Sequence, residues 1–203
     1  MELYEAIRTR RTVRKFTSEP VSPELLQKLV ERALYAPAVA DERPWRFYLV
    51  TNREFIGKMA QLVHRRLEEL FGGTDKGNLL KTVDHYATIF AEAPALILIA
   101  AKPYHAVADD LGKLSHETIN EMRRHPDLQS IGAAVENMLL SAAEFGLGGC
   151  WLSGLMAART DLEELLGVKE PWQLVTAAAF GKPAAQPQPH EPPRVQDHIS
   201  IIA

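Results

Sequence analysis

Four cations, a hydroxyl and an aromatic ring lie within seven residues near the start of the chain. The run comprises Arg10, Arg11, Thr12, Val13, Arg14, Lys15 and Phe16. Arginine presents a planar fork of donors that matches two oxygens of a phosphate, and a threonine hydroxyl adds a neutral donor. The run therefore predicts a site for a phosphate-sized anion, with a solvated helix end bearing surface ion pairs as the alternative.

Positive charge is concentrated at this end of the chain. Residues 1–16 carry five Lys and Arg against two Glu, whereas the 203-residue chain has 23 Lys and Arg, 26 Asp and Glu and a net charge of −3. Nucleic-acid-binding domains usually spread basic residues over a face and have a high pI, but the pI here is near 6.2. We therefore expect a single phosphate ligand and no nucleic-acid partner.

A glycine-rich turn at residues 146–154 is the second chemical feature. Its sequence is Gly-Leu-Gly-Gly-Cys-Trp-Leu-Ser-Gly. Glycines let backbone amides approach a flat ligand without obstruction by side chains. The turn follows a predicted helix and leads into a predicted strand, so it is not a dinucleotide fingerprint. A helix C-cap with a tight turn is the alternative interpretation.

The sequence offers no self-sufficient catalytic group. Cys150 lies in an apolar run without a histidine near it in sequence, which is typical of a small core residue rather than a nucleophile. A loose cluster of metal-ligand types is interpreted as a solvated loop rather than a metal site; its members are His105, Asp109, Asp110 and His116. An anion site and a glycine-flanked surface without a nucleophile predict a holder for an organic cofactor that brings its own reactivity.

The elements that must position these residues follow from hydrophobic spacing and from start and stop signals. Ser22 and Pro23 predict the start of a helix that ends near Pro37. Further helices are predicted at residues 53–70, 129–145 and 161–166, and strands at residues 45–50, 95–100, 151–152 and 174–180. The uninterrupted apolar run at 95–100 is typical of a central strand covered on both faces.

The end of the chain predicts an extended tail. Residues 183–193 hold five prolines, which disfavour a helix. Ile199, Ile201 and Ile202 then follow, and we expect their burial either against a partner subunit or against the chain's own domain.

Composition is that of an ordinary globular protein. The chain is 46% hydrophobic and 24% charged, with one cysteine, which suits a reducing cytoplasm. Its longest apolar run, residues 93–101, is about half the length that a membrane helix needs. We expect one domain over residues 1–203, located in the cytoplasm and without membrane contact.

Four segments, in order, resemble the nitroreductase family of FMN-dependent oxidoreductases. Residues 4–16 are similar to the family's RRSxRxF motif, residues 36–47 to APSxxNxQPWxF and residues 146–154 to GLGxCWxxG. Gly181-Lys182-Pro183, followed by Pro193-Arg194, is similar to its closing segment. The resemblance covers nearly the whole chain.

The resemblance implies an α+β fold in three layers. A central mixed, mainly antiparallel sheet would be flanked by helices, and the C-terminal tail, residues 183–203, would extend onto the partner subunit of a homodimer. Residues 102–127 would form a lid-like insertion that shapes specificity.

The resemblance also implies roles for particular residues. Arg10, Arg11 and Arg194 would hold the FMN phosphate, Thr12 would bond near the ribityl chain or ring edge, and Arg14 would face the pyrimidine end. Trp151, Leu152, Ser153 and Gly154 would meet the flavin near N5 through their backbone. Pro37, Ala38 and Val39 would come from the other subunit, and Asp41 would also belong to the cofactor site. No side chain would act as a catalyst, because the flavin carries the chemistry.

The loop at residues 36–47 departs from the family pattern at three positions. Ala38 replaces the usual Ser, Asp41 the usual Asn and Arg43 the usual Gln, so a hydroxyl and an amide are missing. An ionised Asp41 facing the flavin would repel a reduced, anionic ring unless Arg43 or Arg14 neutralised it.

The expected activity is ping-pong two-electron reduction of a small-molecule acceptor, such as a nitroaromatic or a quinone, by NADH or NADPH. Three alternatives stay open. The flavin could serve other chemistry, such as dehalogenation or enoate or azoline oxidation. It could be bound without turnover. The basic run could instead bind phosphate or nucleic acid, which would leave the protein colourless.

Overall fold

The computed structural model describes residues 2–39, 42–73, 75–188 and 191–202. Its α-helices are α1 (Leu3–Thr9), α2 (Pro23–Ala33), α3 (Arg53–Phe71), α4 (Gly77–Thr88), α5 (His116–Met122), α6 (Pro126–Glu144) and α7 (Arg159–Leu166). Its strands are β1 (Trp45–Val50), β2 (Ala95–Ala101), β3 (Gly148–Leu152) and β4 (Gln173–Gly181). Short 3-10 helices are η2 (Val107–Leu111), η3 (Gly154–Ala158) and η4 (Val195–Asp197).

The four strands form one sheet in the order β1-β2-β4-β3. All three neighbouring pairs are antiparallel. The predicted mixed character is therefore limited, among the described residues, to an isolated parallel bridge between Thr12 and Gly149. Every residue of β2 is buried, which confirms that the apolar run at 95–100 is an inner strand.

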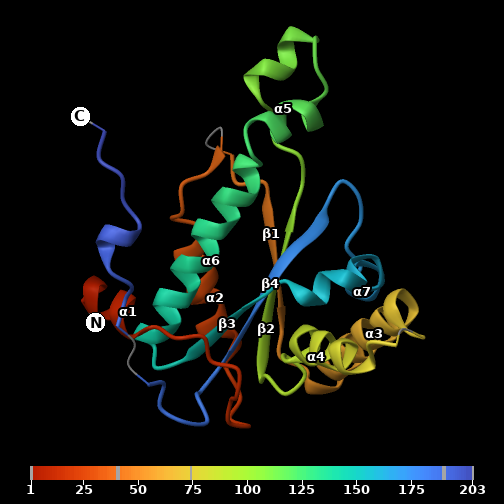
Figure 1. Ribbon diagram of the computed structural model, residues 1–203, viewed down its shortest axis with the longest axis vertical. Helices are drawn as coiled ribbons and strands as arrows, with labels where there is room; N and C mark the ends of the chain where they lie inside the picture. Colours follow the sequence, from red (N-terminus) through yellow and green to blue (C-terminus); the bar gives the residue numbers. More distant parts are fainter. Residues whose placement is uncertain (1, 40–41, 74, 189–190, 203) are drawn as a thin grey trace.

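Helices cover both faces of the sheet, which confirms the predicted three-layer α+β fold (Figure 1). On one face, α2 and α6 pack against the side chains of Ile97 and Ile99. On the other, α3, α7 and η3 pack against Leu96 and Leu98. The alternation of β2 side chains between these two cores follows from the two-residue period of a strand.

The long helices begin where local signals place them. Ser22 caps α2, its Oγ accepting a hydrogen bond from the Leu25 amide at 3.2 Å. α6 begins at Pro126, three residues before the predicted start, because proline suits the first helical turn. Gly146, at φ +73°, ends this helix region as expected, since glycine adopts that conformation without strain.

Three helices escaped the sequence analysis. α1, α4 and α5 each have a single buried residue, namely Ala6, Ala87 and Ile119. One buried position gives α1 and α5 no recognisable period, whereas α4 also carries the partly buried Leu80 at helical spacing. α5 and η2 belong to the predicted insertion at 102–127, which projects from the end of the sheet (Figure 1).

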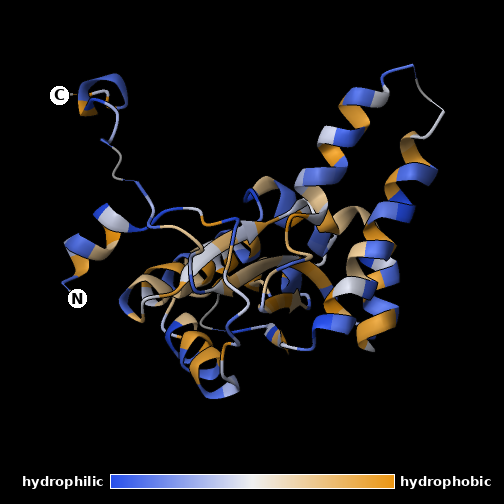
Figure 2. Cartoon of the chain, turned by 90° about the horizontal axis from the view of Figure 1, so that it is seen from below, coloured by the Kyte–Doolittle hydropathy of each residue, from blue (hydrophilic) through white to orange (hydrophobic). Residues whose placement is uncertain are grey.

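The C-terminal segment leaves β4 and runs in irregular conformation past α1, projecting away from the body (Figure 2). Ile201 and Ile202 are 86% and 96% exposed. The chain's own domain therefore does not bury these two side chains.

Candidate functional site

The basic run lies directly against the glycine-rich turn. Thr12 forms a parallel bridge with Gly149, and the Val13 amide donates to the Gly149 carbonyl at 2.9 Å. A Cβ added at Gly148 would lie 2.6 Å from the Val13 Cβ, which no side chain tolerates. Glycine at this position therefore allows the two motifs to meet.

Side chains alternate along this extended segment. Val13 is buried, whereas Thr12 and Arg14 are exposed. In extended backbone, residues two apart share a side. The segment thus presents a hydroxyl and a guanidinium on the same side, with Val13 as the anchor.

A cavity of about 360 Å³ lies between the basic run and the glycine turn. Arg10 and Arg11 form part of its wall, and residues 146–149 form another part. The Arg10 Nε is buried and makes no hydrogen bond, although it lies 3.1 Å from Glu136 Oε1 as an ion pair. The Arg11 guanidinium donates to backbone carbonyls, including that of Gln188 at 3.1 Å.

Arg14 borders a different cavity, of about 700 Å³. Its lining also includes Lys15, Phe16, His85, Tyr86 and Glu92. His85 and Tyr86 come from α4, with ring centroids 5.4 Å apart. The sequence analysis missed them because it missed this helix, although the spacing of Leu80, Val83 and Ala87 was a usable signal.

Gly154 ties α4 to the glycine turn. A Cβ at this position would lie 2.9 Å from the Ala87 Cα, a backbone atom that cannot rotate away. The absence of a side chain lets α4 approach. The cavity beside Arg14 and the turn at 151–154 are therefore neighbouring features.

Trp151 is held in one orientation at the sheet edge. Its Nε1 donates to Thr176 Oγ1 at 2.8 Å, and that hydroxyl donates to the Leu152 carbonyl at 2.9 Å. Leu152 is buried, whereas Trp151, Ser153 and Gly154 are exposed. β3 ends the sheet, and past Gly149 no described strand pairs with its outer edge. Strand β3 thus has an edge that is not paired with another described strand past Gly149.

The loop at 37–39 lies elsewhere in the chain. The buried Val39 donates its amide to Ser130 Oγ at 3.1 Å, near the start of α6. Arg10 instead contacts α6 at Glu136, and its cavity is lined by Leu139 and Ala143 of that helix. At 1.5 Å per residue, these points lie about 9 to 20 Å from Ser130 along the helix.

One further predicted residue, Arg194, does not meet the basic run within the described part of the chain. Arg194 is 82% exposed and pairs with Asp197 at 3.1 Å. Asp41 lies outside the described residues. The structure thus joins residues 10–14 to the glycine turn but leaves Pro37, Ala38, Val39 and Arg194 apart from them.

The structure also bears on two other groups considered for chemistry, the Cys150 thiol and the cluster of His105, Asp109, Asp110 and His116. Burial raises the pKa of the Cys150 thiol, opposed by the charge of Arg14, so this group is not an activated nucleophile. Among the described residues, no group of three or more His, Cys, Asp or Glu is arranged to hold a metal ion. His105 and His116 instead pair with Asp110 and Asp109, both at 2.9 Å.

Comparison with known proteins decides the family. The sequence model of the nitroreductase family matches residues 7–182. The chain belongs to the nitroreductase family, which is a family of oxidoreductases. A relative from Methanothermobacter thermautotrophicus, whose name includes NADH dehydrogenase/NAD(P)H nitroreductase, is 26% identical over 192 residues, which cover 92% of this chain and 80% of the relative.

Two solved structures have folds similar to that of this nitroreductase-family chain. A BluB-like flavoprotein from Clostridium difficile 630 has 29% identity and a TM-score of 0.89, with 100% of both chains covered. A nitroreductase with bound FMN from Desulfitobacterium hafniense has 21% identity and a TM-score of 0.76, again with 100% of both chains covered. No helix in the described part of the chain is long and apolar enough to span a membrane.

Proposed function

We propose that this protein is an FMN-dependent oxidoreductase that uses NADH or NADPH for ping-pong two-electron reduction of a small-molecule acceptor. The family assignment supports the reaction class. The bound FMN of one structural neighbour and the flavoprotein description of another support the cofactor. The proposed location is the cytoplasm.

The environment of Arg10 indicates which residues would bind the cofactor's phosphate. The buried Nε of Arg10 makes no hydrogen bond and lies 3.1 Å from Glu136 Oε1 as an ion pair. A phosphate would give this guanidinium an anionic partner able to accept charge-assisted hydrogen bonds. With Arg11 beside it and Thr12 on the adjoining extended segment, the donor set fits the phosphate and the start of the ribityl chain.

The ring would lie along the exposed edge of β3. When bound, FMN supplies hydride acceptance and donation at N5. Arg14 would stabilise negative charge at the pyrimidine end through its fixed cation. The backbone at residues 152–154 would bond the N5 side of the ring, and His85 and Tyr86 would line the cavity beside Arg14.

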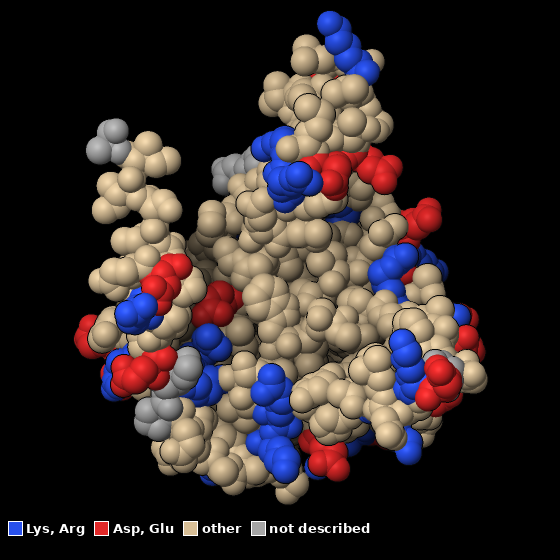
Figure 3. Space-filling view, in the orientation of Figure 1, with Lys and Arg blue, Asp and Glu red and all other residues tan. Residues whose placement is uncertain are grey.

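A homodimer would complete this site. Pro37, Ala38, Val39 and Asp41 would reach the flavin of the partner, and Arg194 would arrive with the C-terminal tail. The separation of about 9 to 20 Å along α6 between these contacts supports contributions from two chains. So does the centre of the face around α6, which is nearly free of charged side chains (Figure 3), as interface cores usually are.

A second candidate keeps the flavin but changes its chemistry. The BluB-like flavoprotein matches with a higher TM-score than the FMN-bound nitroreductase, 0.89 against 0.76. Ala38 and Arg43 also remove the hydroxyl and amide expected of the family pattern. This candidate function is dehalogenation, oxidation of an enoate or azoline, or flavin binding without turnover.

Equilibrium binding of FMN tests the cofactor assignment. Protein stripped of flavin is titrated with FMN and with riboflavin, which lacks the phosphate, while flavin fluorescence is recorded. We expect saturable quenching at one site per chain and markedly weaker binding of riboflavin. Equal affinity for the two ligands would remove the role assigned to Arg10 and Arg11.

A further inference from the structure

Three imidazole–carboxylate pairs hold the insertion at residues 102–127 together. The pairs are His105 Nε2–Asp110 Oδ1 at 2.9 Å, His116 Nδ1–Asp109 Oδ2 at 2.9 Å and His125 Nε2–Glu121 Oε2 at 2.6 Å. Each pair joins two parts of the insertion: the strand exit to η2, η2 to α5, and α5 to the start of α6. Such pairs attract as ions only while the imidazole is protonated.

The apolar core of the insertion is small. One cluster of four buried residues supports it, namely Val39, Tyr104, Ala106 and Ile119. Segments with few buried apolar contacts open locally at low free-energy cost. The polar pairs therefore have a proportionately large effect on whether this segment stays folded.

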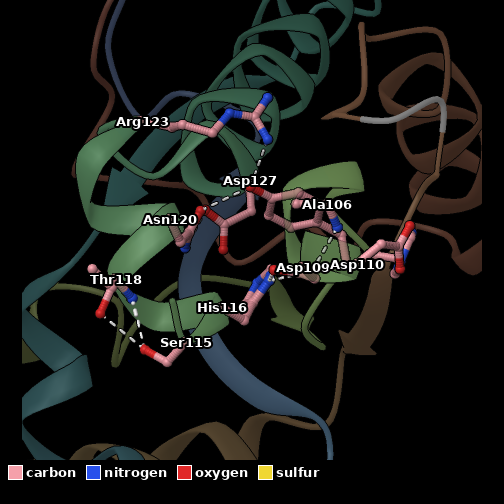
Figure 4. A network of polar contacts seen from close by, with 11 residues as sticks. Ala106, Asp109, Asp110, Ser115, His116, Thr118, Asn120, Arg123 and Asp127 are labelled. Carbon is pink, nitrogen blue, oxygen red and sulfur yellow. Dashed lines mark hydrogen bonds and ion pairs between the residues drawn. The ribbon is translucent and has the colours of Figure 1, made fainter. Parts of the chain in front are cut away.

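The most buried pair is built into this core (Figure 4). Asp109 Oδ2 accepts hydrogen bonds from the Ala106 amide at 2.8 Å and from His116. The His116 ring packs edge-on against Tyr104, with centroids 4.9 Å apart. The Tyr104 hydroxyl donates to Asn120 Oδ1 and accepts from Arg123, both at 3.2 Å.

The charges around His105 come from two parts of the chain. Its pKa is raised above the ordinary 6.5, first by the hydrogen bond to Asp110 and then by the charges of Asp110, Asp109 and Glu42. The pKa of Asp109 is lowered, first by the Ala106 amide and also by His116. Asp109 thus stays ionised at pH values where His105 titrates.

We propose that residues 102–127 form a pH-dependent lid, held folded by its three imidazole–carboxylate pairs and loosened as His105 loses its proton. A group with a raised pKa in the folded state stabilises that state fully below its ordinary pKa. For His105, this contribution is lost as the pH rises above 6.5 through the raised value. The lid is therefore firmer in mildly acidic than in mildly alkaline solution.

Loosening of the lid affects the loop that precedes β1, because the two share a small core. Val39 belongs to the lid core and donates its amide to Ser130. If Pro37 and Ala38 contact a flavin as proposed above, lid opening alters that contact and the entry of the acceptor. This consequence rests on the proposed function, whereas the pH dependence of the lid does not.

Hydrogen exchange measured by mass spectrometry tests the proposal on the purified protein. Protection factors, which remove the intrinsic pH dependence of exchange, are compared at about pH 6 and about pH 8.5. We expect lid peptides to lose protection by about two- to fivefold, the scale of partly exposed ion pairs. Peptides from β2 should not change, because that strand is fully buried.

Glutamine variants identify the groups responsible. The triple variant His105→Gln, His116→Gln, His125→Gln keeps hydrogen-bonding side chains but cannot gain charge, so its lid protection should not depend on pH. The matched control is His64→Gln, which removes a similar pair with Asp84 at 2.8 Å between α3 and α4. This control should keep the pH dependence of the lid.

Two results would overturn the proposal: equal lid protection in the wild-type protein at both pH values, or an unchanged pH dependence in the triple variant. If the triple variant does not fold, the single variant His105→Gln, at a side chain 57% exposed, must reduce the dependence. The exchange measurement needs no flavin. A failed FMN titration would therefore refute the proposed function and leave the lid result standing.

Discussion

At the scale of single residues, Arg10 and Glu136 make opposite contributions to anion binding. Replacing both Arg10 and Arg194 by Ala should weaken FMN binding by about 2–4 kcal/mol, because two charge-assisted contacts are lost. Fluorescence titration measures the change, with circular dichroism to verify the fold. Arg124→Ala, at an exposed lid arginine paired with Glu121, is the control and should bind FMN normally. An unchanged affinity in the folded double variant would show that the phosphate binds elsewhere.

Glu136→Gln should have the reverse effect. The carboxylate lies 3.1 Å from the Arg10 Nε and competes with any phosphate for that guanidinium. Removing its charge should tighten FMN binding by about threefold to tenfold, as expected for a partly exposed ion pair. The same titration measures it, with riboflavin as the control ligand because its binding should not respond. Weaker FMN binding by this variant would contradict the assignment.

The contact between Val13 and Gly148 can be tested by a double-mutant cycle. Gly148→Ala should destabilise the protein by about 1–3 kcal/mol, since the new Cβ would lie 2.6 Å from Val13. In a Val13→Gly background the penalty should shrink, because the Val13 Cβ and both of its methyl groups are gone. Urea unfolding of the four proteins gives the coupling, and an equal penalty in both backgrounds would show that the two motifs do not meet.

The chemistry of the basic run and the glycine turn could be predicted from sequence, because donor type and glycine's freedom are local properties. The contact between Val13 and Gly148 could not, since it joins positions far apart in the chain. His85 and Tyr86 were missed for a related reason: only the packing of α4 on Gly154 brings them near Arg14.

At the scale of elements, α2 leads into the loop at 37–39 and depends on its cap. Ser22→Ala should destabilise the protein by about 1 kcal/mol, because the Leu25 amide loses its acceptor. Ser22→Asp keeps an acceptor at this position and should cost less. Thermal unfolding followed by circular dichroism measures both, and an equal loss for the two variants would mean that the cap contributes nothing.

Prediction succeeded where an element has many buried positions. β2 and the long helices α3 and α6 carry several buried residues each, so their periods are visible in the sequence. Helices α1 and α5 are seven residues long and expose most side chains. Their formation depends on tertiary contacts and caps, which hydrophobic spacing does not report.

At the scale of the whole molecule, the C-terminal tail is expected to join two chains. Three of its isoleucines are more than half exposed, at 53%, 86% and 96%. Replacing Ile199, Ile201 and Ile202 together by Ser should shift the protein from dimer towards monomer, because buried apolar area drives association. Light scattering after gel filtration measures the mass. Leu79→Ser, on the exposed side of α4, is the control and should leave the mass unchanged.

The same tail explains the limits of sequence reasoning at this scale. The fold follows from patterns within one chain, and the structure confirms its layers. A partner leaves only indirect traces, such as exposed isoleucines and a face of low charge. A dimeric wild-type protein that stays dimeric in the triple serine variant would show that another surface holds the subunits together.

The most direct test of the central claim is an anaerobic absorbance titration of the FMN-loaded protein with NADH and then NADPH. We expect at least one reductant to bleach the flavin band near ~450 nm. Addition of a nitroaromatic or quinone acceptor should then restore it. Bound flavin that stays yellow with both reductants would contradict an NAD(P)H oxidoreductase and favour flavin binding without turnover.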